Sequence, residues 1–268
     1  MEILFELGFL QRALAAGVFL GLACALLGVF LVLKKDALIG HGLSHVTFAG
    51  VALAMTLGVL PLAVALAAAV AAGLGISWLK DKAGLYGDTV IGIFSSVSMA
   101  LGVLLVSLSR KFNVSLLQYL FGEILAVQAL EVWLSAGLAV LALLTVLLGG
   151  RRIMYMTFDS EAARAAGVPT GGLDRLLSVL AAVTVVLGTK IIGILLISAF
   201  LVIPAAAGLQ VASSFRRALV YSVLISLVSV TGGIIASFFL DLPASASIVI
   251  LSFLLFVFCF LLRAVRSR

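Results

Sequence analysis

The chain has 268 residues, of which 64% are hydrophobic and 10% are charged, and its formal net charge at pH 7 is +6. Soluble domains carry about 25% charged residues, so this composition excludes a soluble globular domain and predicts a protein that crosses a membrane several times. The positive charge does not indicate a nucleic-acid partner, because the basic residues gather at the ends of apolar segments, where they orient membrane helices.

Nine apolar segments are long enough to cross the ~30 Å hydrocarbon core as helices. We therefore expect an all-α, polytopic helical membrane protein with about eight or nine transmembrane helices, in a single transmembrane domain that covers the whole chain. The N-terminus begins with acidic and apolar residues instead of a basic region before a cleavage site, so we expect no removable signal peptide. Cys24 and Cys259 lie within apolar segments and are expected to be packing residues. The predicted crossings are residues 13–33, 37–57, 61–79, 89–109, 130–148, 173–189, 191–209, 217–239 and 245–262.

The basic residues predict the orientation of these crossings. All but four of the 17 basic residues fall on one side, and the positive-inside rule assigns that side to the cytoplasm. The N-terminus is then expected outside and the C-terminus inside. The four basic residues on the outer side are Arg12, Arg110, Lys111 and Lys190.

The second crossing carries both histidines of the chain, His41 and His45. Residues four positions apart on a helix lie about 40° apart around its axis, so the two imidazoles share one face and can bind one cation. His45 is expected roughly 13 Å along the helix from Asp36, near the middle of the membrane core. A histidine in an apolar helix can also simply hydrogen-bond a neighbouring helix. Two histidines at ligand spacing favour a functional site, because ionisable groups are costly inside a membrane.

Residues 113–129 are apolar but too short to cross the membrane twice, and both of their flanks fall on the outer side. We expect this segment to be re-entrant or interfacial. Glu123 is the one acid in its apolar part. It is either an interfacial side chain exposed to water, or a third ligand or gate for the ion.

The longest cytoplasmic break spans residues 149–172 and has the signals of a short helix. Ser160 is a suitable N-cap, Glu161 suits the positive start of a helix, and Gly167 followed by Pro169 ends it. We expect a short exposed helix on the cytoplasmic face. It is either a plain linker or a docking element for a soluble partner.

Several blocks of the sequence, in the same order, resemble the permease subunits of ATP-binding-cassette importers for divalent metals, the zinc and manganese type called the ABC-3 family. The resemblance covers essentially the whole chain. Many members carry Asp at the position of His41. Imidazole suits zinc, whereas carboxylates and water suit manganese, so we expect zinc as the transported ion and manganese as the alternative. The matching blocks are residues 27–34, 40–45, 119–127, 158–167 and 201–206.

The resemblance implies a homodimeric permease in the cell membrane of a prokaryote. It also implies two cytoplasmic ATPase subunits and an extracytoplasmic metal-binding protein that delivers the ion. His41 and His45, with Glu123 as a third ligand, would bind the transported metal ion, and no permanently bound cofactor is expected. The short cytoplasmic helix would couple to the ATPase through Asp159, Glu161, Ala162 and Gly167.

Two other functional classes fit the sequence less well. An intramembrane metalloenzyme would need a Glu next to His41 as general base, and Gly42 stands there. An ion-coupled secondary transporter would need acids within its crossings, and the predicted crossings contain almost none. The chain also lacks the Gly-x-x-x-x-Gly-Lys-Ser/Thr phosphate loop, so we do not expect it to hydrolyse ATP itself.

Overall fold

The computed structural model describes residues 8–109, 122 and 127–266, and these residues form helices and turns without any strand. Helices prevail because backbone N–H and C=O groups inside a bilayer have to be satisfied within their own segment. The predicted all-α fold class is confirmed. The helices are α2 (Gly8–Leu33), α3 (Ile39–Leu57), α4 (Pro61–Ala83), α5 (Gly87–Ser109), α7 (Ala129–Phe158), α8 (Ser160–Ala165), α9 (Thr170–Ile191), α10 (Ile194–Val211), α11 (Phe215–Leu240) and α12 (Ala244–Arg266).

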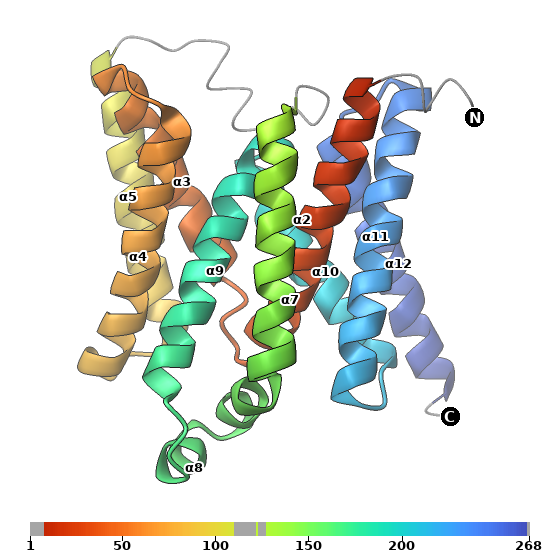
Figure 1. The fold of residues 1–268 in the computed structure, drawn as a ribbon. Helices are drawn as coiled ribbons and strands as arrows, with labels where there is room; N and C mark the ends of the chain where they lie inside the picture. Colours follow the sequence, from red (N-terminus) through yellow and green to blue (C-terminus); the bar gives the residue numbers. More distant parts are fainter. Residues whose placement is uncertain (1–7, 110–121, 123–126, 267–268) are drawn as a thin grey trace.

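The long helices run alternately up and down, and each of them corresponds to one predicted crossing (Figure 1). The start of α2 lies at one end of the bundle, whereas α8 and the end of α12 lie at the other (Figure 1). The end with α8 also holds Lys34, Lys80 and Arg217, which stand at the ends of apolar helices. The positive-inside rule assigns this end to the cytoplasm, and we call it the cytoplasmic end and the opposite one the outer end.

Most of the described helices can cross a membrane by their own length and composition. Seven are long and apolar enough, namely α2, α4, α5, α7, α9, α11 and α12, and α10 contributes a shorter apolar helix. The 19-residue helix α3 is not in this group, and its sequence contains His41, Ser44 and His45. The helix that carries both histidines therefore differs from the seven candidate spans in the polar residues of its first half.

Helix α2 lies at the centre of the bundle, and its side chains Leu20, Leu27 and Phe30 are almost completely buried. A Cβ atom on Gly28 would lie 2.1 Å from the carbonyl oxygen of Leu201, so the backbones of α2 and α10 are in direct contact. Small residues allow such close approach in membrane proteins. This packing fixes a centre against which α3 and α9 lie.

Helix α7 is longer than the predicted crossing at 130–148, because it continues to Phe158. Gly149 and Gly150 do not end it. A glycine costs a helix only about 1 kcal/mol, and the burial of Ile153 and Met156 in the extension offsets that cost. The first part of the predicted cytoplasmic break is thus helical.

The short cytoplasmic helix exists as predicted, but its N-cap is Asp159 and not Ser160. The Asp159 carboxylate accepts a hydrogen bond of 2.8 Å from the backbone N–H of Ala162. Because α7 ends at Phe158, Asp159 occupies the cap position, where Asp and Ser are about equally favourable. Gly167 follows the helix with a φ of 82°, a conformation that suits glycine and turns the chain toward α9.

Candidate metal site in α3

The two histidines lie side by side on α3. The Nε2 atoms of His41 and His45 are 3.2 Å apart, and the two rings are nearly perpendicular, with an interplanar angle of 86°. Two imidazole nitrogens bound to one tetrahedral zinc ion at 2.0–2.1 Å would be about 3.3 Å apart. The structure therefore brings the predicted pair to the separation that a shared cation requires.

Close packing between α3 and the parallel helix α5 sets the position of His45. A Cβ atom on Gly42 would lie 2.8 Å from the Ile91 side chain, and one on Gly102 would lie 2.5 Å from the ring of Phe48. These two glycines let the helices touch on both sides of His45 along the helix axis. The α5 residues at the level of His45 consequently lie between Ile91 and Gly102.

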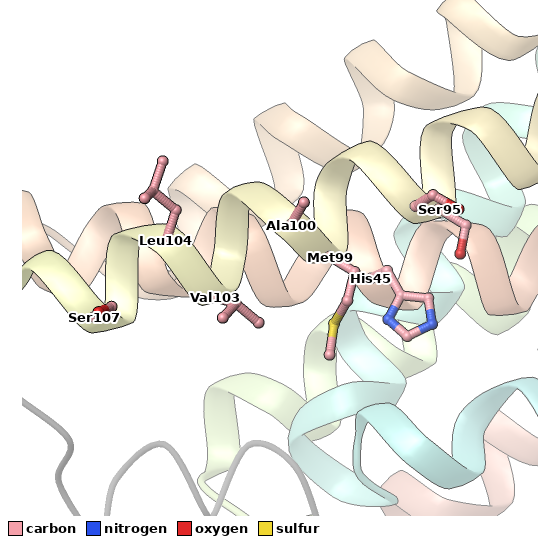
Figure 2. A pocket seen from close by; sticks show the side chains of 8 residues that line it. His45, Ser95, Met99, Ala100, Val103, Leu104 and Ser107 are labelled. Atoms are coloured by element: carbon pink, nitrogen blue, oxygen red, sulfur yellow. The ribbon is translucent and has the colours of Figure 1, made fainter.

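An open groove lies beside His45 (Figure 2). Its volume is about 740 Å³. The groove follows one face of α5 from the level of His45 toward the outer end of that helix. Its lining residues are His45, Ser95, Ser96, Met99, Ala100, Val103, Leu104 and Ser107.

The sequence predicted one further ligand for the ion. Glu123 lies outside the described residues. In residues 8–109, 122 and 127–266, no group of three or more His, Cys, Asp or Glu side chains is arranged to hold a metal ion. The hydroxyls of Ser44 and Thr47 donate to the carbonyl oxygens of Gly40 and Leu43, four residues before them in α3.

Sequence reasoning did not identify the α5 lining of the groove. A signal exists in the sequence, because Ser95, Met99, Val103 and Ser107 follow one another at intervals of four and share one helix face. Serines within an apolar crossing mark a polar stripe. Which helix that stripe faces depends on tertiary packing, and the sequence pattern does not contain that information.

A second group of ionisable residues lies at the cytoplasmic end of the same region, and we call Lys34, Asp36, Lys80 and Asp174 the lysine–aspartate cluster. The Asp36 carboxylate lies 3.0 Å from the Lys34 ammonium and 2.8 Å from that of Lys80. Lys34 also pairs with Asp174 of α9, which accepts a further hydrogen bond from Ser77 of α4. The cluster thus joins the α2–α3 turn to two other helices.

Burial and neighbouring charges act in opposite directions on the cluster. Burial would raise the pKa of Asp36, but the Lys34 and Lys80 ammonium groups together hold that pKa below its ordinary value. Burial lowers the pKa of Lys34, with Asp36 opposing the shift. Asp36 is therefore ionised at neutral pH and anchors the chain just before α3.

The residues predicted to contact an ATPase lie on and beside α8, at the cytoplasmic end of the bundle (Figure 1). Glu161 and Gly167 are exposed, and Ala162 is half-buried. Ala163 is completely buried, so the helix presents only one face to the surroundings. The expectation that this whole segment is exposed is wrong at that position.

These features define a polytopic helical membrane protein with a candidate cation site on one of its helices. The sequence matches the ABC 3 transport family over residues 6–263. The chain belongs to that family, so the resemblance noted from its sequence blocks is confirmed, as is its multi-pass location in a membrane.

Relatives with different cargoes cover most of the chain. The chain is 34% identical to the high-affinity zinc uptake system membrane protein ZnuB of Haemophilus influenzae, over 96% of each chain. It is 30% identical to the manganese transport system membrane protein MntC of Halalkalibacterium halodurans, over 96% of this chain and 88% of the relative. PsaBC from Streptococcus pneumoniae, solved in complex with Fab, superimposes with a TM-score of 0.84 and 30% identity, over 96% of this chain and 92% of that chain.

Proposed function

We propose that this chain is the membrane permease subunit of an ATP-driven importer that carries divalent metal ions, zinc in the first place, into the cytoplasm of a prokaryote. The observation that carries the proposal is the 3.2 Å separation of the His41 and His45 Nε2 atoms in a member of the ABC 3 transport family. Two neutral imidazoles suit zinc better than manganese. Manganese is the second candidate, because MntC of Halalkalibacterium halodurans is a manganese transport protein at 30% identity.

The groove supports a path for the ion from the outer end. Ser107 lies twelve positions along α5 from Ser95, which corresponds to about 18 Å of helix. An ion that enters near Ser107 would follow α5 inward to His45. Glu123 remains a candidate third ligand, proposed from the sequence alone.

The exposed side of the site supports a homodimer. His41 on α3, a crossing predicted from the sequence, and Ser96 on the candidate membrane span α5 are exposed on the described chain. Lipid tails cannot satisfy such polar groups, so protein or a water-filled passage has to cover them. A second copy of the chain facing α3 and α5 would enclose the groove between the two permeases.

We also propose that the surface of α8 docks a cytoplasmic ATPase, and that an extracytoplasmic metal-binding protein delivers the ion to the outer end. Asp159 caps α8, Glu161 and Ala162 lie on its first turn, and Gly167 sets its exit. A cysteine at exposed Ala165 should crosslink to the ATPase, and one at exposed Leu60 of the outer end should not. Crosslinking of Ala165 to extracytoplasmic proteins only would refute both the docking and the topology.

His45→Ala tests the proposed function directly. Zinc accumulation by cells that express the complete importer should fall to background, because one imidazole cannot replace a ligand pair, while the protein remains in the membrane. Thr56→Ala is a matched control on the same helix, since the Thr56 hydroxyl donates to the carbonyl of Ala52 in its own helix. Accumulation should also stop when the ATPase is inactivated. Normal zinc accumulation by His45→Ala at equal expression would overturn the proposal.

A further inference from the structure

Met99 is the one sulfur-bearing residue among those that line the groove beside His45. Its side chain is 41% exposed, so it does not serve to fill the core of the bundle. Figure 2 shows the thioether of Met99 and the imidazole of His45 on the same side of α5, reaching into the same space. The side chain is thus available to an ion in the groove.

The register of α3 and α5 puts Met99 on the approach to the histidines. Gly42 packs against Ile91, and Gly102 packs against Phe48, so Ser95 lies near the level of His45. Met99 is one helical turn further toward the outer end than Ser95, about 6 Å along α5. An ion that moves inward along the groove reaches the Met99 sulfur before His45.

Among the residues that the structure describes, the lining of the groove contains no carboxylate. Its polar side chains are neutral serines, an imidazole and a thioether. Carboxylate and water oxygens suit manganese, imidazole suits zinc, and the soft thioether favours softer cations. Nitrogen and sulfur donors at the inner end of the groove therefore discriminate against a hard ion.

We propose that Met99 is a specificity-determining residue, whose thioether contacts the ion beside His45 and favours zinc and the softer cadmium ion over manganese. The proposal rests on the proposed function of the His pair as the binding site of the transported ion. Met99 is then a donor on α5, in addition to the two histidine donors on α3 and the candidate ligand Glu123. The preference for softer ions depends on this α5 side chain.

Met99→Leu tests the proposal, because leucine keeps the apolar volume and removes the donor sulfur. In cells with the complete importer, the concentration of external cadmium that halves zinc uptake should rise about tenfold, and the preference for zinc over manganese should fall by a similar factor. Met99→Cys retains a soft sulfur and should preserve cadmium inhibition. Met55→Leu is the matched control, since it removes a thioether from α3 outside the groove and should change neither quantity.

The outcomes separate this proposal from the proposed function. If wild type imports zinc and His45→Ala does not, but Met99→Leu keeps wild-type cadmium inhibition and metal preference, Met99 is not a specificity residue and the His site stands. A similar shift for Met55→Leu would also overturn the proposal, because the effect would then be one of packing. If His45→Ala imports zinc normally, both proposals fall.

Discussion

Asp36 and His41 lie five positions apart, just before and just inside the start of α3, yet their side chains have very different numbers of partners. Asp36 is paired with two lysines, and Asp174 of the same cluster is paired with Lys34 and Ser77. His41 is exposed, and its ring contacts that of His45. The lysine–aspartate cluster is complete within one chain, whereas the His pair has open coordination positions.

The difference separates a structural role from a binding role. Charges taken out of water are tolerated when they are paired, so the cluster holds α2, α3, α4 and α9 together in the folded chain. In the part of the chain that the structure describes, the two imidazoles contact each other, and they can exchange that contact for a metal ion. Stability should therefore depend on the cluster, and transport on the histidines.

The largest expected effect is the loss of stability on Asp36→Ala. The substitution leaves the Lys34 and Lys80 ammonium groups close together without their shared carboxylate, at a cost of about 3 kcal/mol. The midpoint of thermal unfolding of the purified protein should fall by several degrees. Asp88→Ala removes an exposed carboxylate from the first turn of α5 and should have a much smaller effect. Equal shifts of the unfolding midpoint would show that Asp36 in the cluster contributes no more to stability than an exposed carboxylate does.

His41→Asp should change selectivity more than stability. The exposed position 41 accepts a carboxylate without burying it, and the new oxygen ligand should shift the preference from zinc toward manganese by about tenfold. Competition between the two ions for uptake measures that ratio, and thermal unfolding measures stability. An unchanged ratio would argue that position 41 is not a ligand. A stability loss as large as that of Asp36→Ala would contradict the assignment of a structural role to the cluster and a binding role to the histidines.

The smallest effect is a dependence of stability on acid pH. The folded-state pKa of Asp36 lies below the ordinary value of about 4, so its contribution to stability is complete above pH 4 and is lost as the pH falls through the lowered pKa. Asp36→Asn lacks this titration. The unfolding midpoint of the wild type should therefore decrease more steeply below pH 4 than that of the variant. If the midpoints of the two proteins changed in parallel with pH, Asp36 would not be held ionised by the lysines.

The sequence predicted the features that depend on residues close together in the chain. The apolar lengths predicted the crossings, and the spacing of His41 and His45 predicted their shared face. It missed the continuation of α7 past Gly149, because glycine weakens a helix by less than the packing of Ile153 strengthens it.

The contacts that depend on helix packing could not be predicted from the sequence. The pairing of Lys34 with Asp174 joins residues far apart in the chain, and the approach of Met99 to His45 depends on the register of two parallel helices. Periodicity shows which residues share a helix face but not which helix that face meets. The role of Glu123 remains a prediction from the sequence, since that residue lies outside the described part of the chain.

The polarity of α3 has a consequence for how the protein is made. Of the helices that the structure describes, α3 is not among the seven that are apolar enough to cross a membrane alone, although α2 and α4 on either side of it are. Lys34 and Lys35 hold the start of α3 at the cytoplasmic surface. We therefore expect α3 to insert into the bilayer paired with a more apolar neighbour, so that the polar side chains proposed to bind the ion make its insertion depend on that neighbour.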